Sequence, residues 1–169
     1  MRNIEIKVRV DDLERCAAIL REDLGARDAG VLEQRDVFLP SRSGRLKLRF
    51  ENDQRAQLIL YERADAARLR ASDYELLPID DGDAFLAVAA RAWGLGGEVR
   101  KTRRLFWLDN LRVHLDRVEG LGCFVEIEAV VDAQNDAGRC RDAAHRLLSA
   151  LGLDASAAES RAYVDLLTR

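Results

Sequence analysis

The sequence predicts a domain of the α+β class built on eight strands. Eight segments alternate apolar and polar residues with the two-residue period of a β-strand, and only three or four segments show helical periodicity. Several strands are joined by short connections, which favours an antiparallel sheet or barrel. With 169 residues the chain suits one domain with a sizeable core, so we expect a single domain over residues 1–169.

The first half of the chain opens with a strand at residues 2–10, where charged or polar side chains alternate strictly with Ile and Val. Asp11 and Asp12 then precede an amphipathic run that ends at Gly25, which predicts a capped helix. Strands are expected at residues 31–39, 45–51, 57–63 and about 70–79.

The second half begins with a helix at residues 80–93, which carries aspartates in its first turn and has Gly94 just after its end. A sixth strand follows at 98–108, and two more lie within residues 112–132 around a glycine-containing turn. Helical periodicity returns at 137–151 and near 160–167.

Nearly every predicted strand is apolar on one face and charged, in both signs, on the other. Exposed charges are common, so such a face can simply be the solvent side of an amphipathic sheet. If the sheet closes, however, the charges line an interior that is stable only when it is wet or filled by an ionic ligand. The charged positions are Glu5, Lys7, Lys47, Arg49, Asp73, Glu75, Lys101, Arg103, Arg112, Asp116, Glu126 and Glu128.

Two glutamates in the last predicted strand suggest what such a ligand would contain. Glu126 and Glu128 are two residues apart and therefore share a face, where their carboxylates repel unless a cation lies between them. Carboxylates hold Mg²⁺ or Mn²⁺, and the lysines and arginines of other strands suit phosphate groups. The pattern therefore favours an anion that is bound together with a divalent metal ion.

Composition excludes several classes. The formal net charge of -3, from 27 basic and 30 acidic side chains, argues against a general nucleic-acid binder. Cys16, Cys123 and Cys140 lack the spacing of a zinc site or disulfide framework, so free thiols in a reducing cytosol are expected. No apolar run is long enough to span a bilayer, which predicts a cytoplasmic protein without membrane contact. Dimerisation through outer apolar strand faces is compatible with this pattern.

Taken together, these motifs resemble the CYTH family, also called triphosphate tunnel metalloenzymes, which includes class IV adenylate cyclases and thiamine triphosphatases. The family signature is an E-x-E-x-K strand at the N-terminus, here residues 3–7 (NIEIK), and a closing E-x-E, here Glu126 and Glu128. Residues 114–128 (HLDRVEGLGCFVEIE) look most like the cyclase branch. The resemblance implies an eight-stranded antiparallel β-barrel that forms a tunnel, with helices packed outside and Mg²⁺ or Mn²⁺ as cofactor.

The resemblance also assigns residue roles. The implied metal ligands are Glu5, Asp116, Glu126 and Glu128, and these four with Lys7 form the implied catalytic set. The implied substrate-binding residues are Lys7, Lys47, Arg49, Arg63, Glu75, Lys101, Arg103 and Arg112.

The chain departs from the family signature at its first glutamate, which is Asn3. Loss of that charge should weaken a second metal ion. Three hypotheses follow: cyclisation of ATP as in class IV adenylate cyclases, hydrolysis of inorganic or thiamine triphosphate, and capture of a polyphosphate without turnover. The expected partner in each case is a small-molecule triphosphate.

Overall fold

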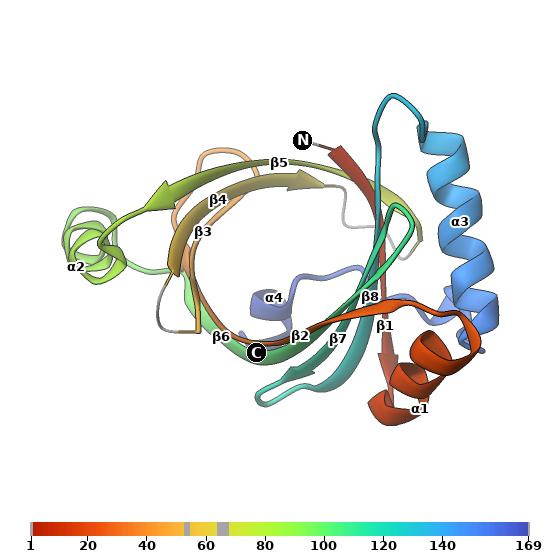
Figure 1. Cartoon of the computed structure of the whole chain (residues 1–169). Coiled ribbons are helices and arrows are strands. Elements are labelled where there is room, and N and C mark those ends of the chain that lie inside the picture. The colour runs from red at the N-terminus through yellow and green to blue at the C-terminus, as the bar shows by residue number, and fades with distance from the viewer. Residues whose placement is uncertain (1, 53–54, 64–67, 169) are drawn as a thin grey trace.

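The strands form one closed antiparallel barrel in the computed structural model, which describes residues 2–52, 55–63 and 68–168 (Figure 1). The order around the barrel is β1-β5-β4-β3-β2-β6-β7-β8, and β1 closes it by pairing with both β5 and β8. The strands are β1 (Arg2–Val10), β2 (Arg27–Leu39), β3 (Arg45–Glu51), β4 (Arg55–Arg63), β5 (Arg70–Ile79), β6 (Gly97–Leu108), β7 (Leu111–Val118) and β8 (Gly122–Val130). The predicted α+β class and barrel are confirmed.

Strand β2 differs most from its predicted bounds, because it begins at Arg27 rather than at residue 31. Its pairing with β6 shifts register between Asp28 and Val31, and Gly30 in this irregularity has a φ of 96°. An irregularity of this kind breaks the alternation by which a strand is detected in a sequence, although pairing continues on both sides of it.

The helices lie outside the barrel or at its end. They are α1 (Leu13–Ala18), which continues as the π-helical turn η1 (Ile19–Asp23), α2 (Gly82–Trp93), α3 (Ala137–Ala150), the short 3₁₀ turn η2 (Ala155–Ala157) and α4 (Tyr163–Leu167). Side chains of Asp12 and Asp81 accept N-cap hydrogen bonds at α1 and α2. The cap of α1 was predicted, whereas α2 begins at Gly82 rather than at residue 80, so Asp81 precedes its first turn. None of the described helices combines the length and apolar character needed to cross a membrane.

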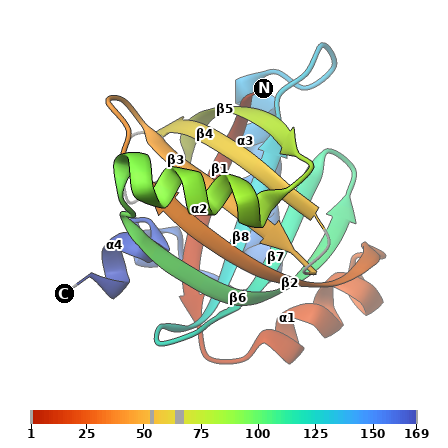
Figure 2. The same ribbon diagram turned by 90° about the vertical axis from the view of Figure 1, so that its left-hand side faces the viewer.

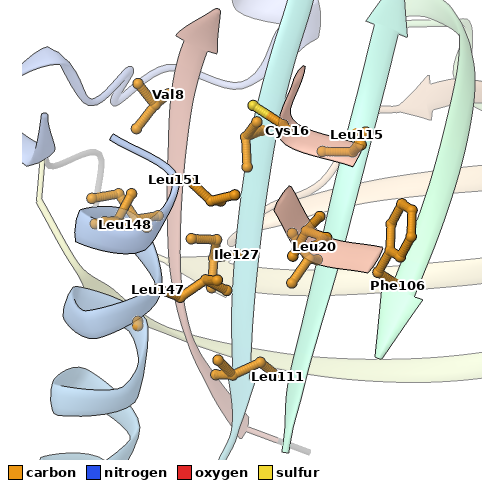
Figure 3. Packing of buried hydrophobic residues seen from close by; sticks show 14 of the residues in the cluster. Val8, Cys16, Leu20, Phe106, Leu111, Leu115, Ile127, Leu147, Leu148 and Leu151 are labelled. Atoms are coloured by element: carbon orange, nitrogen blue, oxygen red, sulfur yellow. The ribbon is translucent and has the colours of Figure 1, made fainter. Parts of the chain in front are cut away.

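The main hydrophobic core lies between the barrel and the helices that cover it, rather than inside the barrel. Helices α1 and α3 pack on the outer faces of β1, β7 and β8 (Figure 3). Ile127 from β8 is fully buried beside Leu147 and Leu151 from α3, and Leu20 comes from the helical segment after β1. Because the apolar strand faces turn outward to these helices, the charged faces turn inward.

Helix α2 covers the opposite side of the barrel, over β3 and β4 (Figures 1 and 2). Its first residue, Gly82, touches the barrel wall. A Cβ at this position would lie 2.5 Å from Cβ of Ala56 and 2.7 Å from Cε1 of Phe50. A glycine is therefore required for the helix to begin this close to the sheet.

The C-terminal segment closes one end of the barrel, where α4 appears within the ring of strands in Figure 1. Val164 packs in a cluster with Phe38 and Val99 from the barrel wall. Arg45 donates a hydrogen bond of 2.7 Å to the carboxylate of Asp165, which ties α4 to β3. We call this the closed end and the opposite end the open mouth.

Candidate active site inside the barrel

The barrel encloses a cavity of about 340 Å³ whose wall carries both signs of charge. Its basic lining residues are Lys7, Lys47, Arg49, Lys101, Arg103 and Arg112. Its acidic lining residues are Glu5, Asp36, Glu51, Glu126 and Glu128. Most of the predicted site residues therefore meet in one place, which strand alternation and closure of the sheet together bring about.

One wall carries three cations around a single carboxylate. Asp36 of β2 is paired in register with Arg49 of β3, and its side chain accepts hydrogen bonds of 2.6 and 2.8 Å from that guanidinium. Lys47 and Lys101 donate to the same carboxylate at 2.9 and 3.0 Å. We call these four residues the cradle.

The cradle carries more positive than negative charge. Burial and the neighbouring Arg49 lower the pKa of Lys47 to about 7, although Asp36 opposes this shift. Burial also disfavours the ionised form of Asp36, but its three cationic neighbours outweigh burial and hold its pKa well below the ordinary value. Asp36 supplies one negative charge to three cationic side chains. A multiply charged anion that enters the cavity would supply the negative charge that is missing.

Arg103 joins the cradle to the neighbouring wall, which β7 and β8 form. Its guanidinium donates two hydrogen bonds of 2.6 Å to Asp116 and one of 2.7 Å to Glu126. Asp116 is completely buried and also accepts a hydrogen bond of 3.0 Å from the hydroxyl of Tyr163 in α4. Burial would raise the pKa of Asp116, but Arg103 outweighs it and the pKa is lowered. Asp116 therefore stays ionised and orients Arg103.

The wall formed by β7 and β8 brings His114, Glu126 and Glu128 together, with one potential ligand atom of each within 4.8 Å of the others. Nδ1 of His114 lies 3.7 Å from Glu126 and 3.8 Å from Glu128, and it is buried without a hydrogen-bond partner. The glutamates also contact Arg103 and Arg112, at 2.7 and 2.9 Å. We call His114, Glu126 and Glu128 the trio.

The donors of this wall fit a divalent cation. Two carboxylates satisfy the protein share of an Mg²⁺ or Mn²⁺ site. Asn3, on the adjacent strand β1, donates from its side-chain nitrogen to Glu128 at 3.1 Å, which leaves its buried Oδ1 without a partner. A side-chain carbonyl oxygen and an imidazole nitrogen are thus both available beside the two carboxylates. The mixed set is more favourable for Mn²⁺ than for Mg²⁺, which takes oxygen ligands almost exclusively.

The other two predicted metal ligands face guanidinium groups. Glu5 accepts a hydrogen bond of 3.2 Å from Arg70, and Asp116 is held by Arg103. Glu5 is also the register partner of Glu128, so it lies next to the trio. The metal-binding roles of Glu5 and Asp116 stay predictions.

Lys7 links the cavity to the closed end. Its ammonium donates a hydrogen bond of 2.5 Å to the carbonyl oxygen of Arg161 and lies 4.2 Å from the ring centre of Tyr163. The carbonyl oxygen of Lys7 accepts in turn from the backbone N–H of Glu159. Lys7 therefore lies in the cavity wall and also holds the C-terminal segment in place.

Strand β5 requires a correction, because the face that turns inward is not its charged one. Ser72, Tyr74 and Leu76 line the cavity, so alternation places Glu75 outside, where it is exposed. Glu75 is thus not in a position to contact a ligand in the cavity. The side chain of Arg63 lies outside the described part of the chain, and its predicted role is not tested.

Several residues of the site are absent from the predicted set, among them His114, Asp36, Arg70 and Tyr163. Asp36 ends the polar run of residues 33–36, which lacks strand alternation, and only its pairing with β3 and β6 shows that three cations surround it. Arg70 begins β5 and meets Glu5 only because β1 closes the barrel against β5. Tyr163 of α4 lies at the closed end. Its hydrogen bond to Asp116 joins residues 47 positions apart, which no local pattern shows.

A closed barrel with a cationic cradle beside a cluster of potential metal ligands defines a tunnel protein for polyanions. The family model described as the CYTH domain matches residues 1–163, and the chain belongs to the CYTH family. Proteins of this family are generally metal-dependent and bind triphosphate substrates.

The chain is also similar to individual proteins and solved structures. A Methanocaldococcus jannaschii protein named "Putative adenylate cyclase" is 22% identical over 98% of each chain. A solved structure from Pyrococcus horikoshii is 26% identical, with a TM-score of 0.86 over 97% of this chain and 98% of its own. A structure from Pyrococcus furiosus is 24% identical, with a TM-score of 0.84 over 97% and 99% of the two chains.

Proposed function

We propose that the protein is a metal-dependent adenylate cyclase that converts ATP into cyclic AMP and pyrophosphate. The observation that supports this proposal most is the arrangement of the cradle and the trio on adjoining walls of one cavity, with Arg103 of β6 between them and in contact with the trio. The family binds triphosphates, and the resemblance of residues 114–128 to the cyclase branch favours ATP.

The cations would hold the triphosphate. Lys47, Arg49 and Lys101 already surround one carboxylate at 2.6 to 3.0 Å, which is the spacing that phosphate oxygens need for charge-assisted hydrogen bonds. Arg103 and Arg112 extend this positive surface towards the trio. Binding at several fixed cations orients the chain of phosphates and neutralises its charge.

Glu126, Glu128 and His114 would hold the metal ion, with Glu5 and the carbonyl oxygen of Asn3 beside them. A divalent cation at this position supplies charge neutralisation at phosphate oxygens and lowers the pKa of a bound hydroxyl. Burial opposes ionisation of Glu126, but the neighbouring His114 and Arg103 hold its pKa well below the ordinary value. This carboxylate is therefore ionised at neutral pH.

The reaction would be an in-line displacement. The 3′-oxygen of the ribose forms a bond to the α-phosphorus, and the bond between that phosphorus and the bridging oxygen to the β-phosphate breaks. The hydroxyl proton leaves to the pyrophosphate or to solvent. Within the predicted catalytic set, Lys7 contributes charge at the closed end, and Asp116 positions Arg103 against Glu126.

The test is a product assay with ATP and either Mg²⁺ or Mn²⁺, in which cyclic AMP, pyrophosphate and orthophosphate are separated. We expect cyclic AMP and pyrophosphate in equal amounts, and almost complete loss of both in Glu126→Gln. Glu75→Gln is the matched control, because Glu75 is exposed on the outer face and should leave the rate unchanged. Turnover that survives Glu126→Gln would contradict the assignment of the trio.

Hydrolysis of inorganic or thiamine triphosphate is the second candidate. The contact of Arg103 with Glu126 favours it. A terminal phosphate held by this guanidinium would lie beside the potential metal ligands of the trio, where water could attack it. Orthophosphate as the product would support this candidate. Measurable binding without any product would leave only the capture of a polyphosphate without turnover.

A further inference from the structure

Part of the cavity wall becomes apolar towards the open mouth. The inward residues of β6 run from Lys101 through Arg103 to Leu105 and then Trp107. Gly97, at the start of this strand, pairs with Phe38 in the cluster at the closed end, so Trp107 is at the far end of the strand. Along β6 the wall therefore changes from cationic to apolar as it leaves α4.

Two other strands show the same change. On β2 the inward residues run from Phe38 at the closed end through Asp36 and Gln34 to Leu32, which pairs in register with Arg103. On β5 they run from Ser72 through Tyr74 to Leu76. Because all three strands end in this way at the same mouth, apolar side chains lie on two sides of it: one group on β5, and the other on the paired strands β2 and β6. The polar Gln57 and Glu51 of β4 and β3 lie between the two groups. We call the apolar residues of both groups the collar. Its members are Leu32, Leu76, Leu105 and Trp107.

The collar adjoins the trio. Leu105 is the register partner of His114, and Trp107 is the partner of Arg112, whose guanidinium binds Glu128. A ligand whose phosphates lie between the trio and the cradle would thus have its other end at the collar. This end of the cavity is not shielded by the protein, since Leu76 is 41% exposed and the other three members are partly exposed.

A bare triphosphate does not account for such a collar. Its oxygens are strongly hydrated and carry no apolar surface, so leucine and tryptophan side chains add nothing to its binding. An aromatic ring attached through an ester to the first phosphate would bury these side chains from water, and it could stack on the indole of Trp107.

We propose that the collar binds the organic group of the substrate and selects triphosphates that carry an aromatic ring, such as a nucleobase, over inorganic triphosphate. This inference rests on the proposed function, because it requires that a triphosphate lies in the cavity. Leu76 and Trp107 are its specificity-determining residues.

The experiment compares two probes by calorimetry in the presence of Mn²⁺. One is ATP with a methylene group in place of the α,β-bridging oxygen, which blocks release of pyrophosphate, and the other is inorganic triphosphate. Stacking of a base on an aromatic side chain typically changes affinity by about 10-fold or more. We therefore expect the wild type to bind the ATP analogue at least about 10-fold more tightly than inorganic triphosphate.

Trp107→Ala and Leu76→Ala should remove this preference by weakening binding of the analogue, while the affinity for inorganic triphosphate stays the same. Leu77→Ala is the matched control, because Leu77 is the next residue of β5, is 57% exposed and lies on the outer face. Since Leu76 is also exposed, its truncation should leave folding intact even if Trp107→Ala does not.

The outcomes separate the two proposals. Equal affinities of the wild type for both probes, or equal losses for both probes in the variants, would overturn the collar but leave the triphosphate site. Failure of the wild type to bind either probe would overturn the proposed function and the collar with it.

Discussion

Replacement of Asp36 by asparagine tests whether the cradle is held together by one buried carboxylate. Asp36 is 2% exposed and accepts hydrogen bonds from Lys47, Arg49 and Lys101 at 2.6 to 3.0 Å. Asn keeps the size of the side chain but removes its charge, so the buried Lys101 and the partly buried Lys47 and Arg49 would face one another without compensation. Removal of one partner from a buried ion pair typically costs about 3–5 kcal/mol.

Urea unfolding of Asp36→Asn should therefore show a loss of about 3–5 kcal/mol in the free energy of unfolding, with an unchanged denaturant slope. Asp28→Asn is the matched control on the same strand. Asp28 also binds an arginine, Arg104, but the two side chains are 30% and 29% exposed. An exposed pair of this kind contributes less than about 1 kcal/mol.

Inorganic triphosphate should then rescue the Asp36→Asn variant. Its oxygens can replace the missing carboxylate as partners of the three cations, so a saturating concentration should stabilise the variant more than it stabilises the wild type. Equal losses of stability in the Asp36 and Asp28 variants would refute the account of the cradle. An equal gain from triphosphate in variant and wild type would refute its role in binding phosphate.

Three further predictions concern the cavity and its support. Triphosphate affinity, measured by calorimetry, should fall by up to about 10-fold per pH unit above pH 7. Burial and Arg49 lower the pKa of Lys47 to about 7 in the free protein, and a bound anion raises this pKa, so binding favours the protonated lysine. Lys47→Arg should remove the pH dependence, because an arginine stays charged. His114→Ala should weaken Mn²⁺ binding by at least about 10-fold and Mg²⁺ binding much less, with Mn²⁺ binding measured by electron paramagnetic resonance. Equal losses for both ions would exclude the imidazole as a ligand. Gly82→Ala should destabilise the protein by about 1–3 kcal/mol in urea unfolding, because its Cβ would lie 2.5 Å from that of Ala56, and an unchanged midpoint would contradict this packing.

Much of this architecture is visible in the sequence, because strand alternation is a local property. The sequence correctly predicts which face of each strand is charged for β1, β3, β6, β7 and β8. Closure of the sheet turns these faces towards one cavity. Glu126 and Glu128 could be recognised as neighbours from their spacing alone. Their association with His114 follows from the pairing of β7 with β8, which a hairpin of this kind makes predictable.

The parts that escaped prediction depend on which strands pair across long sequence separations. Asp36 acquires its role from β3 and β6, and Arg70 acquires its role from closure of β5 against β1. For Glu75 the prediction assumed that charge marks the inner face of every strand. Strand β5 instead turns Ser72 and Tyr74 inward, and the hydroxyl of Tyr74 accepts a hydrogen bond from Arg112 across the cavity.

The central claim is that the trio and the cradle hold one triphosphate between them. Its most direct test uses the paramagnetism of bound Mn²⁺ to detect phosphorus nuclei that lie near the metal ion. Phosphorus magnetic resonance of the methylene analogue of ATP should show strong paramagnetic relaxation of its phosphates in the wild type. This relaxation should disappear in Glu126→Gln, through loss of the metal ion, and in Arg49→Ala, through loss of the phosphates. A protein that binds Mn²⁺ and the analogue together without this relaxation would contradict the claim.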